Sequence, residues 1–161
     1  LLTSPFLHAA LVMALVCALW PPSTSWAERT IAVIPSLLGL TLAGYAILLA
    51  IGSEKFLKRL ARPGNAKKSV LENLSTSFLH FVLVQAAALM LALIAESLAI
   101  PVRALLTEYA SEALAATVRF ACRWLGWTAM FYSITCSLAA TFRLFRMVGW
   151  FVRDISGSSQ Q

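Results

Sequence analysis

The chain has 161 residues, of which 60% are apolar and 12% are charged, with 13 Lys and Arg against 7 Asp and Glu. A soluble domain is about 45–50% apolar and about 25% charged, so a soluble enzyme, a disordered chain and a fibrous protein are all excluded. The net charge of +6 lies mostly beside apolar stretches, which favours anionic lipid headgroups over nucleic acid as the partner.

Four apolar stretches are long enough to cross a bilayer as helices, because a crossing helix needs about 20 residues. They cover residues 1–20, 30–52, 75–96 and 123–143, with approximate bounds. The sequence therefore predicts an all-α polytopic integral membrane protein. Its 161 residues are expected to form a single membrane domain, built as a bundle of four transmembrane helices.

The first stretch has a second interpretation. With Ser25, Trp26 and Ala27 after it, residues 1–20 resemble a signal peptide followed by a cleavage site. The apolar run lacks the basic segment that precedes it in signal peptides, which favours a transmembrane helix. The first residue is not Met, so the chain can belong to a longer one.

A basic linker, residues 53–74, joins the second and third stretches. Residues 53–62 are expected to form a short amphipathic helix, with Phe56 and Leu60 on one face and basic side chains on the other. Such a helix lies in the membrane interface. The candidate contacts to anionic headgroups are Lys55, Lys58, Arg59, Arg62, Lys67 and Lys68. Either they serve only as a topology signal, or they form a specific lipid or regulatory site.

Lys and Arg residues collect on the cytoplasmic side of membrane proteins. In a four-span chain, the basic linker and the segment with Arg143, Arg146 and Arg153 lie on the same side. Both termini are therefore predicted to be cytoplasmic, and residues 154–161 to form a flexible tail.

Pro101 suits the first turn of a new helix, so residues 102–118 are predicted to form a surface helix on the outer side, leading into the fourth span. Glu96, Glu108 and Glu112 would make this outer face acidic. These acids either remain solvated at the surface or form a vestibule that attracts cations.

Three of the spans carry small or polar residues at alternating spacings of three and four, which is typical of left-handed helix packing in membranes. The pattern predicts that the three stripes share the interior of one bundle, and it also indicates self-association or a membrane-complex partner. The helix-packing residues are Ser36, Gly39 and Ala43 in the second span, Gln85, Ala88 and Ala92 in the third, and Gly126, Ala129 and Ser133 in the fourth. The second-span stripe continues to Ala46 and Ala50.

A polar line follows the fourth span at helical spacing. The candidate pore-lining residues are Arg123, Ser133, Ser137 and Thr141. This line either faces a pore or a sister subunit, or its hydroxyls bond the carbonyl groups of the preceding turn.

The sequence contains no phosphate-binding loop, no HExxH motif and no paired carboxylates within a span, so no enzyme activity and no metal are expected. His8 and His80 fall at a similar depth in the first and third spans, the arrangement of the ligands of b-type haem in small membrane cytochromes. Hydrogen-bonded bundle histidines are the alternative. Cys17 and Cys122 would lie near the outer surface, where a disulfide is conceivable.

The run from Ile34 to Leu49, followed by the basic segment from Lys55 to Arg62, resembles small bacterial four-span proteins, some of which act in phage defence as membrane depolarisers or sensors. The resemblance implies the bacterial inner membrane. The expected function is that of a small oligomerising membrane protein without a catalytic motif, acting as a channel-like or stress and phage-defence effector. A non-catalytic membrane subunit of a larger complex and a small b-type haem electron-transfer protein are the alternatives.

Overall fold

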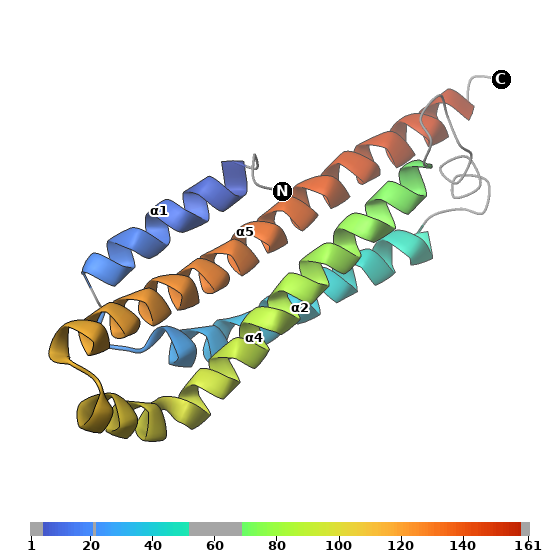
Figure 1. Ribbon diagram of the computed structural model, residues 1–161. Helices are drawn as coiled ribbons and strands as arrows, with labels where there is room; N and C mark the ends of the chain where they lie inside the picture. Colours follow the sequence, from blue (N-terminus) through green and yellow to red (C-terminus); the bar gives the residue numbers. More distant parts are fainter. Residues whose placement is uncertain (1–4, 21, 52–68, 159–161) are drawn as a thin grey trace.

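The computed structural model describes residues 5–20, 22–51 and 69–158. They form four helices, α1 (Pro5–Leu19), α2 (Trp26–Ile51), α4 (Val70–Tyr109) and α5 (Glu112–Ser158), and no strand. The all-α prediction is therefore confirmed for the part of the chain described. Successive helices run in opposite directions (Figure 1). The α1–α2 and α4–α5 turns lie together at one end of the molecule, the turn end, and α5 finishes at the other, the C-terminal end.

The helices form a three-helix core with one flanking helix. Helices α2, α4 and α5 all pack against one another, whereas the extensive contacts of α1 are with α5 alone. Figure 1 shows α5 lying between α1 and the pair formed by α2 and α4. The buried face of α1 consists of Ala10, Ala14 and Ala18, and Ala14 belongs to a cluster with Trp127 and Met130 of α5. Alanines at a spacing of four let α1 approach α5 closely.

Two of the described helices are long and apolar enough to cross a membrane, α2 over Trp26–Ile47 and α4 over its length. Helix α1 is also apolar, but its 15 residues span only about 22 Å at 1.5 Å per residue. Helices α4 and α5 have 40 and 47 residues, hence lengths of about 60 and 70 Å. Both are far longer than a hydrocarbon core of about 30 Å.

The predicted start of a helix at Pro101 is wrong. Pro101 lies inside α4, which continues to Tyr109, and the break falls at Ala110 and Ser111. Ser111 accepts a hydrogen bond from the backbone N–H of Leu114 at 3.4 Å, so this serine caps α5. An interior proline bends a helix without having to end it, and the last, yellow turns of α4 lie at an angle to its green part (Figure 1).

Two further boundaries differ from the prediction. Helix α5 continues through Ser158, so residues 154–158 are helical instead of a tail; apolar residues keep their helical spacing from Leu144 to Ile155. In the basic linker, residues 70–74 form the first turns of α4. The predicted interfacial helix lies outside the described residues. So do all six candidate headgroup contacts, Lys55, Lys58, Arg59, Arg62, Lys67 and Lys68.

The described helices combine buried polar side chains with a large exposed apolar surface. The buried polar side chains of the described residues are Thr30, Thr41, Gln85, Ser133 and Ser137. Large aliphatic side chains are instead exposed on every helix, among them Leu19, Leu40, Leu83 and Leu125. The interior also holds large apolar side chains, in a cluster of Leu74, Phe78, Phe81 and Met147 and in one of Trp127 and Met130 against Ala14. Small, polar and bulky residues thus pack the helices together, while many other bulky apolar side chains face outward.

Candidate functional site

A buried polar junction joins the three core helices. Gln85 of α4 is fully buried, and its Nε2 donates to Thr41 Oγ1 of α2 at 3.2 Å and to Ser137 Oγ of α5 at 2.5 Å. The two hydroxyls donate in turn to carbonyl oxygens of their own helices, those of Leu37 at 2.9 Å and Ser133 at 3.2 Å. Because a side-chain amide has two donors, one glutamine can link both neighbouring helices.

The polar line of α5 faces the interior of its own bundle. Ser133 is fully buried and donates to the carbonyl of Ala129 at 2.8 Å, and the half-buried Thr141 donates to the carbonyl of Ser137 at 3.0 Å. These are the bonds to the preceding turn that the alternative interpretation predicts. Ser133 and Ser137 are therefore packed among helices, and Arg123 lies apart from them, in a cavity at the turn end.

The predicted packing stripes lie inside the bundle on α4 and α5. Gln85, Ala88 and Ala92 are buried, and of the α5 stripe Gly126 and Ser133 are buried and Ala129 is half-buried. Gly126 is a point of close approach, because a Cβ there would overlap the indole ring of Trp26 at the start of α2.

The α2 stripe lies outside the bundle interior, contrary to the expectation that all three stripes meet there. Ser36, Gly39, Ala43, Ala46 and Ala50 are all exposed, and nothing lies within 4 Å of a Cβ built on Gly39. Helix α2 turns a different face inward, with Thr30, Ile34 and Thr41 buried. Spacing shows which residues share a helix face, whereas the hydrogen bond from Gln85 to Thr41 determines which face of α2 points inward.

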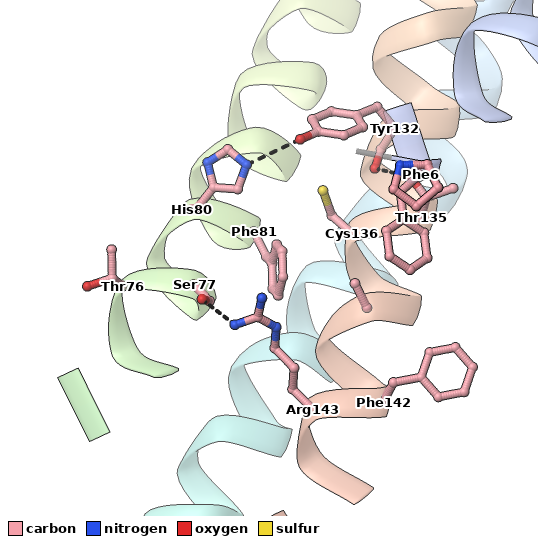
Figure 2. Close-up of a pocket in the computed structure, with 12 residues that line it drawn as sticks. Phe6, Thr76, Ser77, His80, Phe81, Tyr132, Thr135, Cys136, Phe142 and Arg143 are labelled. Carbon is pink, nitrogen blue, oxygen red and sulfur yellow. Dashed lines mark hydrogen bonds between the residues drawn. The ribbon is translucent and has the colours of Figure 1, made fainter. Parts of the chain in front are cut away.

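A cavity of about 620 Å³ opens between the start of α1 and the facing sides of α4 and α5. Figure 2 shows His80 and Tyr132 meeting across it, with His80 Nε2 3.3 Å from the Tyr132 hydroxyl. Arg143 donates to the Ser77 hydroxyl, and its guanidinium lies 5.7 Å from the centre of the Phe81 ring. The cavity thus has apolar walls with one cation at its edge, suited to an amphiphilic molecule more than to a polar substrate.

The two histidines are not brought together in this cavity. His80 lines it and contacts Tyr132, whereas His8 is exposed on α1 and is not among the lining residues. The placement gives no support to paired haem ligands. Cys17, Cys122 and Cys136 are free, and the described residues contain no group of three or more His, Cys, Asp or Glu that could hold a metal ion.

Sequence reasoning missed three polar residues that join helices. Thr41 belongs to the polar junction, Tyr132 pairs with His80, and the Tyr45 hydroxyl lies 2.8 Å from Ser75 Oγ. Thr41 and Tyr45 lie four residues apart on α2, and Tyr132 lies four residues after Thr128 on α5, but none of the three belongs to the stripes of small residues. The signal that could have found them is their polarity alone, since a hydroxyl in an apolar span needs a hydrogen-bond partner.

No protein family model, curated protein or solved structure matches this chain. The roles of these residues therefore follow from their own geometry.

Proposed function

We propose that this protein is a non-catalytic integral membrane protein that crosses the bilayer four times, with both termini in the cytoplasm, and that it self-associates through α2. The observation that carries the proposal is the large apolar surface that all four described helices expose, together with polar side chains buried between them. Leucines on all four helices are exposed while Gln85 and Ser133 are fully buried. The exposed leucines would be unfavourable in water, whereas in lipid such a surface costs nothing. The buried donors of Gln85 Nε2 and Ser133 Oγ are hydrogen-bonded inside the bundle, as donors within a bilayer must be.

Helix α5 supports four crossings although it is less apolar than α2 and α4. Residues 124–142 carry no charge, and Arg123 and Arg143 at their borders lie about 30 Å apart along a helix, the thickness of the hydrocarbon core. The hydroxyls of this segment are bonded to carbonyls of the preceding turn, as at Ser133 and Thr141. Such internal bonding lowers the cost of placing them in lipid.

The exposed α2 stripe supports self-association. Gly39 and Ala43 leave the backbone of α2 open to close approach by another helix, and the bulky side chains of Leu40 and Ile47 border them. Small residues beside larger ones are typical of helix–helix interfaces in membranes. The assembled form is the candidate for a channel-like or defence effector in a bacterial inner membrane. Any conducting path then needs residues other than Ser133 and Ser137, which are packed within one chain.

The proposal is tested by comparing Gly39→Leu with Gly149→Leu. Both glycines are exposed and lie in helices with nothing within 4 Å of a built Cβ, so the two substitutions start from the same open surroundings. Gly39→Leu should abolish the oligomer in native-lipid nanodiscs, measured by light scattering, because added bulk prevents close approach. Gly149→Leu should leave it intact. If the wild-type protein is a monomer in native lipid, self-association is contradicted. The exposed stripe of α2 would then be left for a different protein, as in the alternative of a subunit of a larger complex.

A further inference from the structure

A second cavity, of about 760 Å³, lies at the turn end of the molecule. Three segments far apart in the sequence line it: residues 22–26 at the start of α2, the last turns of α4 from Ala99 to Leu106, and the first turns of α5. Its charged lining residues are Arg103 from α4 and Arg119 and Arg123 from α5, and no Asp or Glu is among the described residues that line it. The face predicted to be acidic thus contains a cavity whose charged lining residues are all basic.

Three arginines line one cavity, so their like charges repel one another. Arginine stays protonated in proteins, so the repulsion cannot be relieved by loss of a proton. Screening by water is incomplete for Arg123, which is half-buried, although Arg103 and Arg119 are exposed. A bound anion is the simplest way to stabilise this arrangement.

Two independent features point to the same kind of ligand. The Nε of Arg123 is buried and has no hydrogen-bond partner, although a buried donor without an acceptor is costly. The start of α2 also faces the cavity, since Ser25 and Trp26 line it. Ser25 already accepts from the N–H of Glu28 at 3.0 Å, so this end of α2 contributes through the positive end of its helix dipole, which favours negative charge.

We infer that this cavity binds a phosphate group, held by Arg103, Arg119 and Arg123. Guanidinium groups recognise phosphate and carboxylate alike, but three positive charges from two helices match the larger charge and the additional oxygens of a phosphate better than those of one carboxylate. The hydroxyl of Thr24, which accepts from Arg29 Nε at 2.6 Å, adds a donor at the rim. The phosphate belongs either to a lipid headgroup or to a soluble ion, because the cavity lies where the protein would leave the bilayer.

The test titrates the purified protein, in detergent free of phospholipid, with inorganic phosphate and separately with short-chain phosphatidylglycerol. Binding is measured by the shift in the thermal unfolding midpoint, with sodium chloride at matched ionic strength as the salt control. Arg123→Gln and Arg119→Gln should each weaken binding about tenfold or more, as expected for loss of a charge-assisted hydrogen bond. Arg119 is exposed, so Arg119→Gln is expected to fold and tests the phosphate site even if Arg123→Gln fails to fold.

Arg153→Gln is the matched control, since it removes the same charge from an exposed position at the C-terminal end. Binding of inorganic phosphate identifies a soluble ligand, and binding of phosphatidylglycerol alone identifies a lipid headgroup. Either result supports the inference if Arg153→Gln binds as tightly as the wild type. Binding of neither ligand, or equal weakening by Arg153→Gln, overturns it. The outcome is separate from self-association, because Gly39→Leu leaves this cavity unchanged.

Discussion

Gln85 shows how a single polar residue can align three helices in an apolar environment. Between membrane helices the hydrophobic effect gives little preference for one neighbour over another, so hydrogen bonds and small residues decide which faces meet. The amide of Gln85 reaches Thr41 and Ser137 only when α2 and α5 both turn these residues toward α4. A rotation of α2 that brought Ala43 inward would carry Thr41 away and leave the amide with one partner fewer.

At the same scale, two glycines are predicted to respond in opposite ways to the same change. Gly126→Ala places a methyl group against the Trp26 ring, and this overlap should lower the free energy of unfolding by about 1–3 kcal/mol. Gly149→Ala meets open space and should raise it by about 0.5–1 kcal/mol, because alanine is the better helix former. Chemical denaturation in detergent measures both. Equal effects of the two substitutions would contradict the close approach of Trp26 to Gly126.

At the scale of elements, α1 is the helix least bound to the rest. Its extensive contacts are with α5, and its inward face consists of alanines. Little area is buried per residue by such a face, so α1 should open without disturbing the three-helix core.

Ala14→Leu tests this independence. Ala14 is fully buried against α5, and the larger side chain should separate the helices at a cost of about 1–3 kcal/mol. Hydrogen exchange measured by mass spectrometry should speed up in α1 while α2 and α4 keep their protection. Met13→Leu, on the exposed side of the same helix, is the control and should change nothing. Faster exchange throughout the core would show that α1 is part of it.

Helix boundaries show where sequence reasoning succeeds and where it stops. Hydropathy alone predicts that residues 30–52 and 75–96 lie in helices, because long apolar runs have few other solutions. The break between α4 and α5 was predicted at Pro101, from the preference of proline for the first turn of a helix. It lies at Ser111 instead, because Pro101 is accommodated inside α4 and Ser111 caps α5. The polar junction was partly predictable, because Gln85 stands out in its span. Thr41 could not be predicted, because its role depends on which helix lies opposite to it.

At the scale of the whole molecule, the packing of α5 bears on the proposed number of membrane crossings. Helix α5 packs against both α2 and α4 and runs beside them from the turn end to the C-terminal end (Figure 1). If α2 and α4 cross the bilayer, a helix packed along them cannot lie flat on its surface. The positive charges of Arg143, Arg146 and Arg153 then mark the cytoplasmic end.

This topology predicts opposite labelling of two exposed positions, Glu108 before α5 and Arg153 near its end. In a background with Cys17 and Cys122 changed to serine, Glu108→Cys should react with an impermeant maleimide in sealed cells. Arg153→Cys should react only after permeabilisation, because residues 124–142 separate the two positions by the width of the hydrocarbon core. The remaining Cys136 is buried, and the background without added cysteines controls for it. Reaction of both positions from the same side would mean that α5 does not cross, whereas reaction of Arg153→Cys alone would reverse the orientation and refute the charge argument.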